Sequence, residues 1–143
     1  MEIIMPRKLD HIIAEMDTAW ETKEGAKAVA EHFADDGVLY DMTSLAPVSG
    51  RAAIEEALAV FTRAFHPLSF ESALVGDDGI TAVVEWKAKG VHAGELDGIA
   101  ATGRTVELHG VNLMTFSSDG KVTQERSYWD SGALLRQLGV FDS

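Results

Sequence analysis

Four segments in the second half of the chain alternate between apolar and polar residues and are joined in pairs by short turns. They cover residues 69–75 and 80–92, separated by Gly-Asp-Asp-Gly, and residues 105–116 and 121–130, separated by Ser-Ser-Asp-Gly. A period of two indicates β-strands, and turns of this composition join the two strands of a hairpin. The sequence therefore predicts two antiparallel hairpins.

Apolar residues at helical spacing precede these strands. They recur over residues 7–20 and 26–33, and a third such segment follows Ser49, whose hydroxyl can cap a helix. Between the second and third segments, residues 38–42 fit a short strand. The first half of the chain is therefore expected to be mainly helical.

Three helices followed by four strands predict one α+β domain over residues 1–143. Helices gathered on one face of a curved antiparallel sheet leave a deep, cone-shaped apolar pocket between the two layers. A chain of this length buries enough surface to build both a core and such a cavity.

Charge and composition exclude several classes of partner. The formal net charge is −11, which repels phosphate backbones, so nucleic acid is not an expected partner. No apolar run approaches the roughly 18 residues that span a bilayer, so no membrane partner is expected either. With no cysteine and no export signal at the N-terminus, the expected location is the cytoplasm.

Alternation assigns side chains to the two faces of the predicted sheet. In residues 80–92, Glu85, Lys87 and Lys89 share the solvent face, which leaves Trp86 and His92 on the inner face.

The next two strands place polar groups on the inner face. In residues 105–116 the amide of Asn112 lies among apolar neighbours, unless Gly110 marks a bulge that reverses the pattern. In residues 121–130, Glu125, Ser127 and Trp129 share one face.

The last third of the chain carries a family resemblance. Residues 90–139 contain GVHAGELDGIAATGRTV, GVNLMTF, DGKV, YWD and LLRQLG. These blocks resemble the SnoaL-like polyketide cyclases, whose superfamily includes ketosteroid isomerases, limonene-epoxide hydrolases and nuclear-transport-factor-like binding domains. The resemblance implies the cone-shaped nuclear-transport-factor-like fold and general acid–base chemistry without a cofactor, on a hydrophobic oxygenated ring or polyketide-like substrate.

A second resemblance covers residues 33–54, FADDGVLYDMTSLAPVSGRAAI, which follow the ketosteroid isomerase pattern without a gap. It implies that Asp41 is the carboxylate that moves a proton between two carbons of a ketone. Asn112 then takes the position of the acid that holds the enolate oxygen. Asp17 takes the position of that family's assisting tyrosine.

One position departs from the cyclase pattern. Cyclases and epoxide hydrolases of this fold carry a working aspartate where this chain has Ser127. A serine hydroxyl does not ionise near neutral pH, so Ser127 is expected to donate a hydrogen bond to an oxyanion rather than to act as an acid or base. Asp130, three residues later, is predicted to cap a terminal helix.

Two further carboxyl groups are candidates for the second titratable group. Glu125 would line the pocket together with Trp129, and burial would then raise its pKa. The alternative is a solvated glutamate paired with Arg126 or a lysine. Asp17 lies in one helical row with Leu9 and would point inward, or else remain partly exposed.

The predicted catalytic residues are Asp41, Asn112, Glu125 and Ser127. The alternation, the helical rows and the resemblance place a further set of residues near the pocket. These predicted substrate-binding residues are Asp17, Trp20, Tyr40, Trp86, His92, Met114 and Trp129. For the large apolar members of this set, core packing is the alternative. The five histidines show no metal-ligand spacing, so neither a metal nor a cofactor is expected.

The leading hypothesis is a cyclase or isomerase, with Asp41 as the base. Two alternatives remain open: hydrolysis of an epoxide by activated water, and a binding domain that takes up a small hydrophobic ligand without turning it over. The outer-facing Val111, Leu113 and His109, together with the family resemblance, predict a homodimer.

Overall fold

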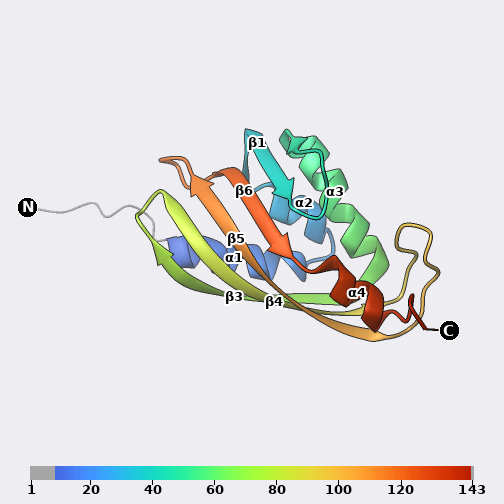
Figure 1. Ribbon diagram of the computed structural model, residues 1–143. Helices are drawn as coiled ribbons and strands as arrows, with labels where there is room; N and C mark the ends of the chain where they lie inside the picture. Colours follow the sequence, from blue (N-terminus) through green and yellow to red (C-terminus); the bar gives the residue numbers. More distant parts are fainter. Residues whose placement is uncertain (1–8, 143) are drawn as a thin grey trace, which may run out of the picture.

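A strongly bent sheet wraps around the N-terminal helices (Figure 1). The structure is a computed structural model and describes residues 9–142. The strand order is β2-β1-β6-β5-β4-β3. The strands are β1 (Phe33–Asp41), β2 (Val48–Ser49), β3 (Phe65–Asp77), β4 (Thr81–His92), β5 (Thr105–Phe116) and β6 (Val122–Trp129), and the helices are α1 (Leu9–Trp20), α2 (Gly25–Ala30), α3 (Arg51–Ala64) and α4 (Ser131–Gln137).

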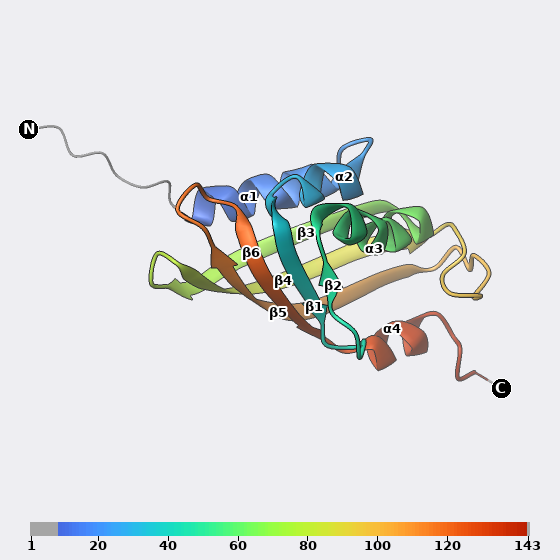
Figure 2. The same ribbon diagram turned by 90° about the horizontal axis from the view of Figure 1, so that it is seen from above.

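The α+β architecture confirms the predicted fold. Seen from above, α1, α2 and α3 lie over the long strands β3 and β4 (Figure 2). Both predicted hairpins are present, β3 with β4 and β5 with β6, and β4 pairs with β5 in the same antiparallel sense. Residues 7 and 8, with which the first predicted helix begins, lie outside the described residues.

The sheet is mixed, so the prediction of a purely antiparallel sheet is wrong in one pairing. The strand β1 begins at Phe33, earlier than expected, and runs parallel to β6. Its register shifts between Phe33 and Val38, and this irregularity accommodates the Ala-Asp-Asp-Gly segment of residues 34–37. The parallel pairing brings Asp41 opposite Ser127.

The predicted start of the third helix is also corrected. Gly50, not Ser49, is the N-cap residue of α3, and no side chain caps this end. Ser49 belongs to β2, where it pairs with Val38. The predicted cap of the last helix is confirmed, because the Asp130 carboxylate accepts a hydrogen bond from the backbone N–H of Ala133 at 3.2 Å.

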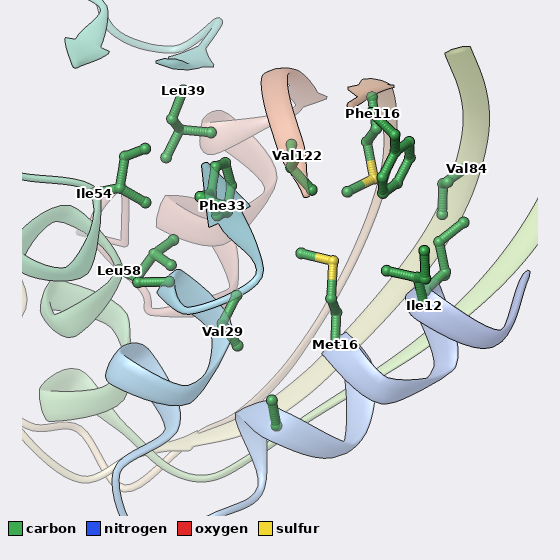
Figure 3. Packing of buried hydrophobic residues seen from close by; sticks show 14 of the residues in the cluster. Ile12, Met16, Val29, Phe33, Leu39, Ile54, Leu58, Val84, Phe116 and Val122 are labelled. Atoms are coloured by element: carbon green, nitrogen blue, oxygen red, sulfur yellow. The ribbon is translucent and has the colours of Figure 1, made fainter. Parts of the chain in front are cut away.

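The main apolar core lies between α1, α2, α3 and the sheet. Figure 3 shows Ile12 and Met16 of α1 near Val84, Phe116 and Val122 of the sheet. Each fully buried side chain of this size contributes roughly 1.5–3 kcal/mol. A second cluster, around α4 and the loop after β4, includes Phe65, Leu96, Val106, Leu134 and Leu138. The packing of these two clusters fixes the helices against the sheet.

Gly110 allows Trp86 to lie flat against β5. The β4–β5 register continues without a shift through the pair of Trp86 with Gly110, so there is no bulge and the predicted faces of β5 are correct. A Cβ atom at residue 110 would lie 2.2 Å from Cζ2 of Trp86. The glycine is therefore needed for close approach of the indole.

Within residues 9–142, no helix is long and apolar enough to cross a membrane.

Candidate active site

A cavity of about 640 Å³ opens between the concave face of the sheet and the helices. Its volume lies within the range of small-molecule sites, roughly 300–1,000 Å³. Most of its wall is apolar, and a few polar side chains interrupt it: Asp17, Asp41, Thr43, Ser44, Ser72, Asp97, Asn112, Glu125, Ser127 and Ser131. A mainly apolar wall with few polar groups suits an organic ligand held by a few directed hydrogen bonds.

Three of the predicted catalytic residues form a row across neighbouring strands. Asn112 of β5 pairs with Ser127 of β6, and Ser127 pairs with Asp41 of β1. All three line the cavity. Because neighbouring strands lie about 4.8 Å apart, these groups can contact one small ligand together.

The hydrogen bonds of Asp41 involve only one of its two carboxylate oxygens. Oδ1 accepts from the backbone N–H of Thr43 at 2.9 Å, from the Thr43 hydroxyl at 2.7 Å and from Nε1–H of Trp129 at 3.1 Å. Oδ2 accepts none from the described residues. The carboxylate is thus fixed in orientation while one oxygen remains available to a ligand.

Trp86 orients the side chain of Asn112. Its Nε1–H donates to Oδ1 of Asn112 at 2.9 Å. An indole nitrogen can only donate, so the oxygen of the carboxamide must face it and the amino group must lie on the other side. Within the described chain this amino group has no hydrogen-bond acceptor, which leaves it free to donate to a ligand oxygen.

Glu125 is buried, as the pocket hypothesis requires. It lies opposite Leu39 and Met114 in the sheet, and only 8% of its surface is exposed. Burial, together with the negative charge of Asp41, raises the pKa of Glu125 to about 7. The alternative pairing with Arg126 is wrong, because Arg126 points to the other face, 5.0 Å above the ring of Tyr40.

Asp17 lines the same cavity from α1. Its two oxygens accept from the backbone N–H of Ser72 at 2.8 Å and from the Ser72 hydroxyl at 2.7 Å. Burial raises the pKa of Asp17, and the nearby charges of Glu21 and Glu71 act in the same direction, against the hydrogen bonds from Ser72. Asp17 thus points into the cavity and is also only half-buried, so both features considered from the sequence are present.

Of the predicted ligand wall, Asp17, Trp20, Trp86, Met114 and Trp129 line the cavity. Aromatic contacts join several of them to residues that the sequence did not single out. Trp20 stacks on Phe70 at 4.6 Å between ring centroids, Phe70 lies 5.5 Å from Trp86, and Phe61 packs edge-on to Trp129 at 6.0 Å.

Tyr40 and His92 do not line the cavity, so the structure corrects these two placements. Tyr40 alternates with Leu39 and Asp41 along β1 and therefore faces the opposite side of the sheet. His92 is fully buried at the end of β4, where its Nδ1 accepts from the backbone N–H of Thr102 at 3.2 Å. Its ring anchors the loop after β4 instead of contacting the cavity.

Part of this wall was not predicted from the sequence. Residues 96–99 form a tight turn with backbone bonds between Leu96 and Ile99 in both directions, and they place Asp97 on the wall. The Asp-Gly pair in this segment is a turn signal that could have been used. Thr43 could have been found from its spacing two residues after Asp41, which is typical of an aspartate turn. Ser72 carried no such signal, because its partner is 55 residues away.

Among residues 9–142, no three His, Asp or Glu side chains come together in a way that could hold a metal ion.

Comparison with known proteins agrees with this architecture. The profile of the SnoaL-like polyketide cyclases matches residues 11–138. The steroid Delta-isomerase of Nocardioides simplex is 29% identical over 110 residues, which cover 76% of this chain and 79% of that enzyme.

Solved structures give the same result for the fold. AclR from Streptomyces galilaeus is 25% identical with a TM-score of 0.78, and the alignment covers 92% of this chain and 96% of AclR. A SnoaL-like protein from Jannaschia sp. CCS1 is 20% identical with a TM-score of 0.80, covering 96% and 97% of the two chains. The fold is ketosteroid isomerase-like. By the match over nearly its whole length, the chain belongs to the SnoaL-like polyketide cyclase family.

Proposed function

We propose that this protein is a cofactor-free isomerase or cyclase that removes a proton next to a carbonyl group of a hydrophobic substrate. The observation that carries the proposal is the row of Asp41, Ser127 and Asn112 across one cavity wall. A base and two hydrogen-bond donors at this spacing match the needs of enolate formation. Similarity to a steroid Delta-isomerase supports the same reaction class.

The first step places the base at Asp41. Its free oxygen, Oδ2, takes the proton from the carbon next to the carbonyl, and the C–H electron pair moves into an enolate. The amino group of Asn112 and the hydroxyl of Ser127 donate to the enolate oxygen as its charge develops. Trp129 and Thr43 keep the carboxylate oriented throughout.

The second step decides between isomerisation and cyclisation. In an isomerisation, Asp41 returns its proton to a different carbon. In a cyclisation, the enolate carbon forms a bond to a second carbonyl carbon, and the resulting alkoxide must take up a proton. Glu125 suits that donor role, because a pKa of about 7 keeps a large fraction of it protonated at neutral pH.

The test is the turnover of a β,γ-unsaturated ketone and of a polyketide ester by the wild type and by Asp41→Asn. Asparagine keeps the size of the side chain but cannot take up a proton near neutral pH, so kcat should fall by about 10²–10⁴-fold. Asp36→Asn is the matched control, because Asp36 is exposed on the same strand. This control should leave kcat unchanged.

Equal turnover by the wild type and Asp41→Asn would exclude Asp41 as the base. If neither substrate is converted, but such a ligand still raises the melting temperature, a binding protein without turnover becomes the better description.

Epoxide hydrolysis is a second candidate, favoured by the two carboxyl groups in one cavity. Asp41 would activate a water molecule, and neutral Glu125 would protonate the epoxide oxygen as the ring opens. Incubation with a cyclic epoxide in ¹⁸O-labelled water distinguishes the two functions. Only hydrolysis produces a diol that contains the label, and Glu125→Gln should then abolish diol formation.

A further inference from the structure

The cavity wall is rich in acidic groups and, among the described residues, lacks any positive side chain. Among the described residues that line it, four are acidic, Asp17, Asp41, Asp97 and Glu125, and none is a lysine, arginine or histidine. Glu125 is more than nine-tenths buried and has no hydrogen bond or ion pair with the described residues. Whenever Glu125 ionises, its charge has no positive counterpart among the described residues.

Aromatic rings line the cavity on the same elements as one of these acidic groups: Trp20 follows Asp17 on α1, and Trp86 pairs with Ser72, the hydrogen-bond partner of Asp17. We call the corner formed by Asp17, Trp20, Phe70, Ser72 and Trp86 the Asp17 corner; all five residues line the cavity. The rings of Trp20, Phe70 and Trp86 follow one another at centroid distances of 4.6 and 5.5 Å. The faces of such rings attract cations within about 6 Å, most strongly where water is excluded.

The partners of Asp17 leave its negative charge uncompensated. Its only hydrogen-bond partner in the described chain is Ser72, which is neutral, and the charged groups that act on it are Glu21 and Glu71. Glu71 itself pairs with Lys87 at 3.7 Å, which occupies that lysine elsewhere. A carboxylate oxygen that already accepts one hydrogen bond can accept a second.

We propose that the Asp17 corner binds a protonated amine, and that the cavity therefore prefers ligands that carry a basic nitrogen on a hydrophobic ring. The ammonium group lies between the Asp17 carboxylate and the aromatic rings, and the rest of the ligand extends along the apolar wall. Carboxylate ligands are disfavoured, because a further anion would enter a site with four acidic groups.

Trp86 links the Asp17 corner to the proposed catalytic row, because its Nε1–H donates to Asn112. One ligand can therefore place its amine at Asp17 and its carbonyl at Asn112. The binding preference itself does not depend on turnover, so it can be tested separately from the proposed function.

The experiment compares three naphthalene derivatives of matched shape: 2-naphthylmethylamine, 2-naphthalenemethanol and 2-naphthoate. Binding is measured by calorimetry at pH 7 and low ionic strength, because salt screens charges. The amine should bind roughly tenfold tighter than the alcohol, and the carboxylate should bind more weakly than both. Equal affinity for the amine and the alcohol, or tighter binding of the carboxylate, would overturn the proposal.

Two variants at the corner separate charge from structure. Asp17→Asn should remove the preference for the amine while the affinity for the alcohol stays the same. Ser72→Ala keeps the charge of Asp17 and loses one hydrogen bond, so it should retain the preference even if its melting temperature falls. An equal loss of amine and alcohol binding in Asp17→Asn, with the fold intact by circular dichroism, would contradict the role of Asp17.

Asp41→Asn is the control that separates the two proposals. It should lose turnover, if the proposed function is correct, and still prefer the amine. If Asp41→Asn removes the preference for the amine and Asp17→Asn keeps it, the amine binds near Asp41, and the assignment to Asp17 is refuted.

Discussion

The pKa of Glu125 makes the stability of the protein depend on pH. A glutamate ordinarily has a pKa of 4.5, and burial raises that of Glu125 to about 7, so between these values the folded protein binds more protons than the unfolded chain. The contribution of this one group to stability then falls by about 3 kcal/mol as the pH rises from about 4.5 to about 7. The glutamine of Glu125→Gln stays neutral, so the variant lacks this loss. Its free energy of unfolding should therefore rise relative to that of the wild type as the pH increases over this range. Urea unfolding at pH 5 and pH 8.5 measures the difference.

A matched control removes the same formal charge elsewhere. Glu85 is exposed on the outer face of β4, so Glu85→Gln should change stability equally at both pH values. Asp41→Asn gives a second check, because the charge of Asp41 contributes to the raised pKa of Glu125. In that variant the pH range of the stability loss should shift downward. An unchanged range would mean that the two carboxyl groups do not interact.

At the level of elements, the contact between β4 and β5 at Trp86 fixes both the sheet and the site. Gly110→Ala would place a Cβ atom 2.2 Å from Cζ2 of Trp86 and 2.8 Å from the backbone oxygen of Tyr128. The indole would have to move, and its hydrogen bond to Asn112 would be lost. We expect a stability loss of roughly 1–3 kcal/mol and lower turnover, measured by urea unfolding and by steady-state kinetics. Gly76→Ala is the control, since a Cβ there meets nothing within 4 Å.

Features that depend on neighbouring residues could be predicted from the sequence, and features that depend on contacts between distant segments could not. Alternation along β5 and β6 placed Asn112, Glu125 and Ser127 on the cavity face. This prediction needs only local sequence, because successive side chains of a strand point to opposite faces of the sheet. It could not give the depth of Glu125, which depends on β1 joining β6 in parallel across the irregular segment after Phe33. The hydrogen bond between Asp17 and Ser72 could not be predicted either, because it joins residues far apart in the sequence. The catalytic roles themselves stay predictions.

At the scale of the whole molecule, the outer face of the sheet carries a small group of apolar side chains, flanked by Glu85 and Arg126, that suggests a second copy as its partner. Val111 pairs with Tyr128 across β5 and β6, and Leu113 pairs with Val83 across β4 and β5. Tyr128 is 40% exposed, and the other three are half-buried. Adjacent apolar side chains on a sheet face mark a contact surface, and a symmetric dimer covers both copies of such a surface at once.

We therefore propose a homodimer, and we expect the mass in solution, measured by light scattering, to be twice that of the chain. Val111→Glu would place a charge among these apolar side chains and should give a monomer, because a dimer would bury one unpaired carboxylate from each copy. Val75→Glu is the matched control, since Val75 is 67% exposed near the far end of β3. It should remain dimeric. A wild-type monomer, or a Val111→Glu dimer of unchanged affinity, would show that this face is not the interface.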